Sequence, residues 1–312
     1  FISSKQSREG VLFVGGNDGM LHGFRDSDGA EVFGFIPRAV LSALPALASP
    51  SYEHRYFVDG QITESDAYLN GAWRNVLVAS AGAGARGIFA LDVTTPTAMN
   101  ASNVLWEFDS TVNAEMGHVL TPVEVGLMKD GTWAAVFGNG SDSASGRARL
   151  FVVNLSNGTV MANIPVGTST TNGLGGVRLI RDGQRVVVGA YAGDLDGNLW
   201  KFDLSSTSPT SWNASFSGNS LFRAVDASNN PRPIVAPPIF VPHPGGGNLV
   251  MFGTGKLYEE GDQVNTQVQA LYGVWDRQVL EYQAGGAVGW SAGSRITDMN
   301  TIVSQRFETD VV

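Results

Sequence analysis

The chain has 312 residues, with 39 Gly, 13 Pro, no Cys and a formal net charge of −9. The acidic balance and the scattered Lys and Arg residues argue against binding to nucleic acid or to an anionic membrane surface. The lack of Cys excludes disulfides, thiol catalysis and zinc–thiolate sites. No run of about 18 apolar residues is present, so the sequence predicts no transmembrane helix.

The main pattern in chain order is a unit in which two β-rich runs flank a Gly-rich turn. In the first copy this turn is Asn17-Asp18-Gly19. The copies are separated by roughly 50 to 65 residues, and self-similarity of this kind is typical of propeller blades with four strands each. The five copies span residues 11–24, 77–93, 135–155, 187–204 and 249–275.

Helical patterns are almost absent from the chain. The one plausible helix covers Arg38–Ala48, and Pro45 interrupts it. Because α/β folds need long helices between their strands, the sequence predicts an all-β fold, a β-propeller in a single domain over residues 1–312. Propellers often close by pairing the two chain ends, and residues 11–14 and 302–307 are the hypothetical partners. Since the chain starts at Phe1 without Met or a signal sequence, we interpret it as a fragment of a longer protein.

One candidate metal site lies in the turn of the fourth copy. Asp194, Asp196 and Asn198 alternate as in the first half of a calcium loop. Phe202 and Ser205 occupy the places where a carboxylate would close such a loop. A hairpin turn stabilised by side-chain hydrogen bonds is therefore favoured, and the three residues remain weak metal candidates.

Other motifs have simpler structural interpretations. His54, Asp59 and Glu64 could suggest acid–base chemistry, but a strand, a turn and a second strand explain the segment. Residues 82–87 are Gly-rich, yet no Lys-Ser/Thr pair or helix follows, so no phosphate loop is expected. The histidines lack the spacing of a zinc helix and are expected on strand faces or loops: His22, His54, His118 and His243. Four tryptophans are expected to pack between blades: Trp73, Trp106, Trp200 and Trp275.

Ordered segments of the chain resemble the PilC/PilY family of type IV pilus biogenesis and tip-associated proteins. The resemblance runs from about residue 11 to residue 276. Each motif is weak alone, and their shared order makes the match specific. The segments include GGNDGMLHGF at 15–24, HRYFVDG at 54–60, VFGNG at 136–140, YAGDLDGNLWKFDL at 191–204, FGTGK at 252–256 and YGVWD at 272–276.

The resemblance implies a modified β-propeller of about seven blades, some of them irregular. It implies a non-enzymatic protein exported to the outer membrane, the cell surface or the pilus tip. The expected role is support of pilus extension and retraction, adhesion and twitching motility. The expected partners are the major and minor type IV pilins, together with host or abiotic surfaces.

The chain departs from the family at its calcium loop, which precedes YAGDL and is rich in Asp. Here the ligand positions fall on Ile180, Asp182, Gln184 and Val188. Only Asp182 is a strong calcium ligand. The segment is better interpreted as a two-residue hairpin with Asp-Gly at its tip. We therefore expect no calcium at this loop and no cofactor.

Two other functions stay open from the sequence. A quinone-cofactor dehydrogenase propeller also carries repeated tryptophans and Asp/Gly turns. Such an enzyme needs converging carboxylates around a cation and a catalytic Asp beside the quinone, and no such set can be assigned. A generic ligand-binding adhesin propeller is the third interpretation, because propellers host many functions.

Overall fold

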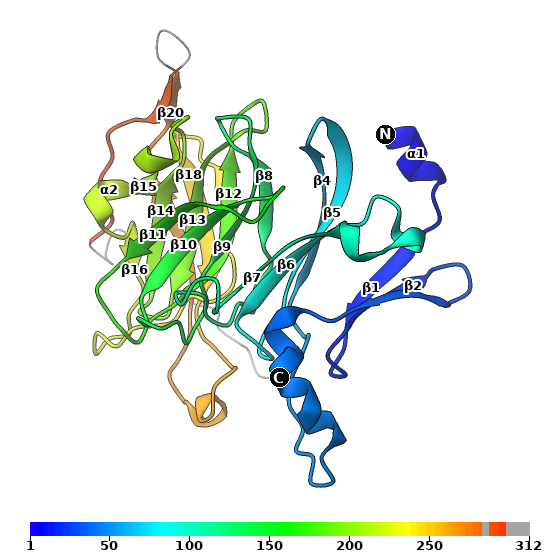
Figure 1. Cartoon of the computed structure of the whole chain (residues 1–312). Coiled ribbons are helices and arrows are strands. Elements are labelled where there is room, and N and C mark those ends of the chain that lie inside the picture. Colours follow the sequence, from blue (N-terminus) through cyan, green and yellow to red (C-terminus); the bar gives the residue numbers. More distant parts are fainter. Residues whose placement is uncertain (283–286, 298–312) are drawn as a thin grey trace, which may run out of the picture.

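The computed structural model describes residues 1–282 and 287–297. Their strands form six antiparallel sheets in chain order (Figure 1). The first sheet contains β1 (Val11–Gly15), β2 (Leu21–Arg25) and β3 (Glu31–Phe35). The second contains β4 (Ile62–Leu69), β5 (Ala72–Ser80), β6 (Gly87–Asp92) and β7 (Val104–Asp109). The third contains β8 (Glu124–Leu127), β9 (Trp133–Gly138), β10 (Ala148–Asn154) and β11 (Val160–Val166).

The remaining strands make three further sheets. The fourth sheet contains β12 (Leu174–Arg181), β13 (Val187–Asp194), β14 (Asn198–Asp203), β15 (Asn213–Ala214) and β16 (Phe222–Arg223). The fifth contains β17 (Ile239–Pro242), β18 (Asn248–Gly253) and β19 (Leu271–Asp276). The sixth is the hairpin of β20 (Leu280–Tyr282) and β21 (Val288–Trp290). Strand numbers per sheet thus vary from two to five, which is the irregularity that the family resemblance implied.

The five predicted strand–turn–strand units are confirmed as antiparallel hairpins. They are the pairs β1–β2, β5–β6, β9–β10, β13–β14 and β18–β19. In the second to fifth sheets, a further strand precedes the hairpin and pairs with its first strand. The first sheet has no such strand among the described residues. The strands β4, β8, β12 and β17 therefore form an equivalent set, which we call the leading strands.

Helices are few and short, as the sequence predicted. The predicted helix at Arg38–Ala48 is a 3₁₀-helix, η1, that contains Pro45. The other helices are α1 (Ile2–Ser7), α2 (Ser215–Gly218), η2 (Pro96–Ala98), η3 (Ala101–Asn103), η4 (Pro209–Ser211) and η5 (Asp262–Val264). None of the helices in the described part of the chain is long and apolar enough to cross a membrane.

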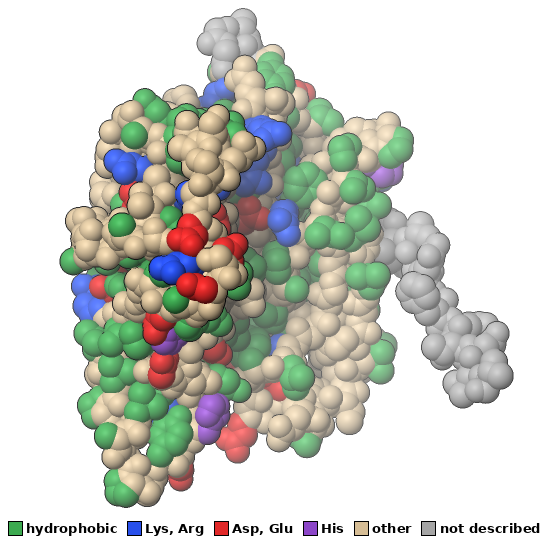
Figure 2. All heavy atoms as spheres, turned by 90° about the vertical axis from the view of Figure 1, so that its right-hand side faces the viewer, with side chains coloured by type: hydrophobic (Ala, Val, Ile, Leu, Met, Phe, Trp, Pro, Cys, Tyr) green, Lys and Arg blue, Asp and Glu red, His purple; other side chains and the backbone are tan. Residues whose placement is uncertain are grey.

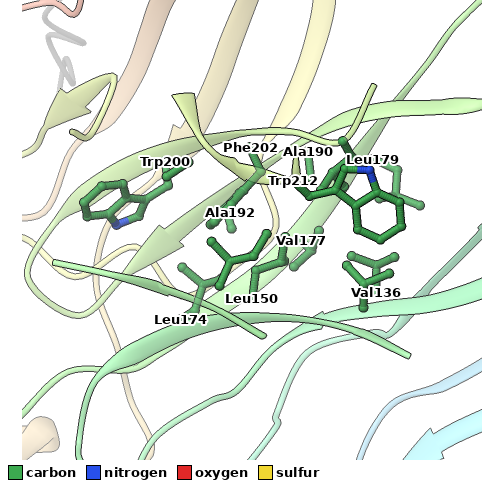
Figure 3. Close-up of a cluster of buried hydrophobic side chains, with 14 of the residues drawn as sticks. Val136, Leu150, Leu174, Val177, Leu179, Ala190, Ala192, Trp200, Phe202 and Trp212 are labelled. Atoms are coloured by element: carbon green, nitrogen blue, oxygen red, sulfur yellow. The ribbon is translucent and has the colours of Figure 1, made fainter. Parts of the chain in front are cut away.

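Side chains that alternate along the strands build the core between successive sheets. In β9, Ala134 and Val136 face the fourth sheet, whereas Ala135 and Phe137 face the second. Four hydrophobic clusters formed in this way join the first five sheets, each to the next. Figure 3 shows the cluster between the third and fourth sheets. Successive side chains of a strand point to opposite faces of its sheet. A strand that is apolar on both faces is therefore expected to pack against one neighbouring sheet on each side.

The first and fifth sheets each have a face that no other described sheet covers. Leu12 and Val14 of β1 are 65% and 48% exposed, and Ile239 and Leu271 of the fifth sheet are 55% and 72% exposed. Exposed hydrophobic side chains are visible on the side of the molecule where the first sheet lies (Figure 2). The predicted closing partner of β1, residues 302–307, lies outside the described residues.

Candidate functional site

The segment expected from the resemblance to correspond to a calcium loop is a hairpin that connects β12 to β13. The Asp182 N–H donates to the Val186 carbonyl at 2.9 Å, and the three residues between them form the loop. Arg185 has a φ of 65°, whereas Gly183 is not in the left-handed region. The predicted two-residue Asp-Gly tip is therefore wrong. A three-residue loop places its left-handed residue last, after a type I turn, and Arg185 occupies that place.

Asp182 is used by its own turn. Its Oδ1 accepts the backbone N–H groups of Gln184 at 2.9 Å and Val186 at 3.0 Å. Ile180 and Val188 are buried in the cluster between the fourth and fifth sheets. Two of the four ligand positions thus contribute hydrophobic side chains to the core. The absence of calcium from this loop stays a prediction.

At the other end of β13, Asp194 is fully buried. Its Oδ1 accepts the Asn198 N–H at 2.8 Å, and its Oδ2 accepts Trp200 Nε1 at 2.8 Å and Asn172 Nδ2 at 3.0 Å. Burial raises the pKa of Asp194, and the hydrogen bonds from Trp200 and Asn198 oppose that rise. The carboxyl group therefore organises the hairpin turn and links it to the loop before β12.

The other two candidates in this turn do not converge with Asp194 on a common point. The Asn198 amide donates to both Asp194 oxygens, at 3.2 Å and 3.0 Å. Asp196 is partly exposed, and its backbone carbonyl accepts Arg223 Nε at 3.4 Å. Within residues 1–282 and 287–297, no group of three or more His, Asp or Glu side chains is arranged to hold a metal ion. The observed hydrogen bonds are those of the hairpin that the sequence favoured.

A polar cluster that the sequence did not predict lies between the fourth and fifth sheets. Lys201 Nζ is 2.6 Å from Asp276 Oδ2, and both side chains are almost completely buried. The Tyr191 hydroxyl donates to the same oxygen at 2.6 Å, and the Trp290 ring covers Lys201 with its centroid 3.6 Å from Nζ. Burial lowers the pKa of Lys201 and raises that of Tyr191. A Lys in the otherwise apolar run 199–202 was the available signal, but its partner is far away in the sequence.

The four histidines are separate from one another in their contacts. His22 lies between Asp18 and Glu31, and the hydrogen bond that its ring donates to Glu31 is the main cause of its raised pKa. His118 Nδ1 is 3.1 Å from the Gly82 carbonyl, and His243 stacks on the Trp275 ring. These contacts agree with the predicted strand-face and loop positions.

The suggested acid–base trio is not a unit, because each member has different partners. Asp59 accepts the Ala83 N–H at 2.9 Å, so it supports the Gly-rich loop 82–87. Glu64 lies 3.5 Å from Lys5, and His54 packs against the Tyr56 ring. The simpler interpretation of this segment, made from the sequence, agrees with these contacts.

The predicted packing of tryptophans between sheets is confirmed for two buried residues and for a third at the rim of such an interface. Trp106 and Trp200 are 7% and 4% exposed within the interfaces on either side of the third sheet. Trp275 is only partly buried, and Trp73 is 46% exposed beside Tyr68 and Trp133. Trp73 packs against Trp133 of the third sheet, as predicted, but it does so at the exposed rim of that interface because it lies at the start of β5 rather than in the buried middle of the strand.

Consecutive antiparallel meanders that pack face to face define the chain as a propeller-type β protein. The sequence model of the PilY1 beta-propeller domain matches residues 1–298. The chain belongs to this family.

Curated relatives and a solved structure agree with the family match. The chain is 41% identical over 295 residues to a type IV pilus biogenesis factor PilY1 homolog of Xylella fastidiosa, and 39% identical over 340 residues to type IV pilus biogenesis factor PilY1 of Pseudomonas aeruginosa UCBPP-PA14. These matches cover 88% and 99% of this chain but 20% and 28% of the relatives. The crystal structure of the P. aeruginosa PilY1 C-terminal domain matches with a TM-score of 0.79 and 37% identity, over 88% of this chain and 59% of that one.

Proposed function

We propose that this chain acts as the propeller domain of a type IV pilus biogenesis factor and supports pilus extension and retraction, adhesion and twitching motility. The observation that carries the proposal is sequence identity of 39% to a named pilus biogenesis factor across 99% of the chain. The match in fold to the C-terminal domain of such a factor supports the same assignment. The proposed domain is a single unit over residues 1–312.

The proposed location is the outer membrane, the cell surface or the pilus tip. The proposed partners are major and minor pilins, with host or abiotic surfaces as further contacts. We propose a role in assembly and binding rather than catalysis, because the relatives are named as biogenesis factors. In this role the buried polar groups around Asp194 and Lys201 hold the sheets together.

The test is an in-frame deletion of this domain from its parent gene in the source bacterium. Surface pili, measured by shearing and immunoblotting, and the diameter of the twitching zone should both fall. Restoration of the intact allele is the control, and an immunoblot of the rest of the parent protein shows that it is still made. Normal pili and normal twitching in the deletion strain would contradict the proposal. A pull-down with purified major and minor pilins then identifies the partner.

A further inference from the structure

A cavity of about 340 Å³ lies where the leading strands of the second, third and fourth sheets meet. The strand β8 contacts β4 on one side and β12 on the other. Glu64 of β4, Glu124 of β8 and Arg178 of β12 line the cavity, and Arg181 lies at the end of β12. The volume falls within the range of small-ligand sites. None of the motifs identified in the sequence accounts for this cavity.

Two arginines converge in the cavity and are only partly used by the protein. Arg178 donates from Nη1 to Glu124 at 2.9 Å and from Nε to the Pro238 carbonyl at 3.2 Å. Arg181 donates from Nη2 to Glu124 at 3.2 Å and to the Val125 carbonyl at 2.9 Å. A guanidinium has five N–H donors. Nη2 of Arg178 and Nη1 of Arg181 have no protein acceptor in the described part of the chain. The two side chains are 39% and 35% exposed.

The charged side chains that line the cavity are two arginines and two glutamates, and further cations outside the lining pair with one of these glutamates. Glu124 is shared by the two arginines, and Glu64 lies 3.5 Å from Lys5 and 3.6 Å from Arg8. The charged cluster therefore has more cations than carboxylates, whereas the chain carries −9. The cations are Lys5, Arg8, Arg178 and Arg181, and the carboxylates are Glu64, Asp66 and Glu124. The excess of one cation in this wider cluster favours an anionic ligand over a cationic one.

The wall beside the arginines is apolar. Pro122 and Pro237 line the cavity and are at least partly exposed, whereas Val123 and Val177 behind them are only 1% exposed. A guanidinium fork matches the planar oxygens of a carboxylate, and the apolar wall suits a small aliphatic group. Inorganic anions would use the arginines and leave this wall in contact with water.

We propose that this cavity binds an amphipathic carboxylate, with its anionic group on Arg178 and Arg181 and its aliphatic group against Pro122 and Pro237. Two sources share this chemistry, namely the C-terminus of a polypeptide that ends in an aliphatic residue and a free branched-chain organic acid. The proposal goes beyond the role in pilus biogenesis and does not depend on it.

Isothermal titration of the 312-residue chain tests the proposal with three probes: acetyl-alanyl-valine, its C-terminal amide and isobutyrate. The acid form of the peptide should bind, and the amide should bind at least about tenfold more weakly, because it lacks the charge that the arginines recognise. Tighter binding of the peptide acid than of isobutyrate identifies a polypeptide C-terminus as the source, whereas equal binding identifies a free acid. Equal binding of acid and amide, or no binding of either acid at millimolar concentration, overturns the proposal.

Variants locate the binding. Arg178→Met and Arg181→Met should each weaken binding of the acid about tenfold, and Arg178→Lys should weaken it less because the charge stays while the fork is lost. Arg74→Met is the matched control: Arg74 is also half-exposed and pairs with Asp92 at 3.2 Å, but it does not line the cavity. Equal loss in the control, or no loss in the two cavity variants, overturns the proposal.

A measurement without mutation covers the case in which a variant does not fold. The peptide acid with ¹³C-labelled valine methyl groups should show nuclear Overhauser contacts to the ring protons of Pro122 and Pro237 in the wild-type chain. Contacts to residues outside the cavity instead would overturn the assignment.

Discussion

The hairpins of the first and fourth sheets share a sequence pattern. The residue that follows this pattern has different surroundings in the two hairpins. Asp18-Gly19-Met20-Leu21 in one matches Asp196-Gly197-Asn198-Leu199 in the other. Both glycines are in the left-handed region, with φ of 94° and 77°. Both leucines are fully buried and face the following sheet.

The position after the leucine points to the preceding sheet. In the fourth sheet it is Trp200, which packs against the third sheet and donates to Asp194. In the first sheet it is His22, which forms ion pairs with Asp18 and Glu31, and no preceding sheet covers it among the described residues. The neighbouring sheet, rather than the turn, thus determines whether this position is an apolar anchor or a titratable surface group.

The largest expected difference in stability is between the substitutions Trp200→Ala and His22→Ala. Trp200→Ala should reduce the free energy of unfolding by about 4 kcal/mol, because it leaves a cavity between two sheets and removes a donor from buried Asp194. His22→Ala should cost about 0.5 kcal/mol, since partly exposed ion pairs contribute little. Urea denaturation followed by near-ultraviolet circular dichroism measures both. Similar costs for the two substitutions would contradict the comparison.

The second test concerns the network behind Trp200. Asp194→Ala should cost about 3 kcal/mol, because Trp200 Nε1 and Asn172 Nδ2 lose their acceptor inside the protein. Asp196→Ala is the matched control in the same turn and should change stability by less than about 0.5 kcal/mol, because that side chain is partly exposed. Equal effects of the two substitutions in urea denaturation would show that Asp194 is not the organising group.

The third test measures how the contribution of His22 to stability depends on pH. Glu31 is the main cause of the raised pKa of His22, so the protonated imidazole is favoured in the folded state. The stabilisation is complete below the unfolded value of about 6.5 and is lost as pH rises through the higher folded value. The difference in unfolding free energy between wild type and His22→Ala should therefore shrink as the pH rises above about 6.5.

Glu31→Gln is the control for this pH effect. It keeps a hydrogen-bonding side chain but removes the negative charge. It should therefore remove most of the pH-dependent part of the difference in unfolding free energy that His22→Ala causes. A difference between wild type and His22→Ala that grows with pH would show that the sign of the linkage is wrong.

The sequence predicted those features that depend on neighbouring residues. The five hairpins follow from β-rich runs around Gly-containing turns, and η1 follows from the apolar run that contains Pro45. The turn at Asp182 was predicted with the wrong length. Asp-Gly is compatible with both a two-residue and a three-residue hairpin loop, and only the pairing register of the two strands distinguishes these. The exposure of Trp73 was missed because the sequence pattern does not show where along a strand the neighbouring sheet ends.

The contacts between sheets could not be predicted from local patterns. Lys201 and Asp276 are 75 residues apart, and Arg178 and Glu124 are 54 residues apart. Without knowledge of how the sheets stack, a Lys in a strand and a Glu at a strand start indicate only that each needs a partner if it is buried. The buried cluster around Lys201 and the cavity at Arg178 are therefore findings of the structure.

The smallest expected effect is that of calcium at Asp182, in the loop between β12 and β13, where we expect no binding. Its carboxylate already accepts two backbone N–H groups of its own loop, and Ile180 and Val188 are buried in the core. A calcium ion needs several oxygen ligands, and its affinity rises with the number of carboxylates. Chelator-treated protein should thus show no calcium binding by isothermal titration, and Asp182→Ala should cost only about 1 kcal/mol through the lost turn hydrogen bonds. Micromolar calcium binding that disappears in Asp182→Ala would contradict this prediction, whereas binding that survives the substitution would direct attention to Asp194 and Asp196.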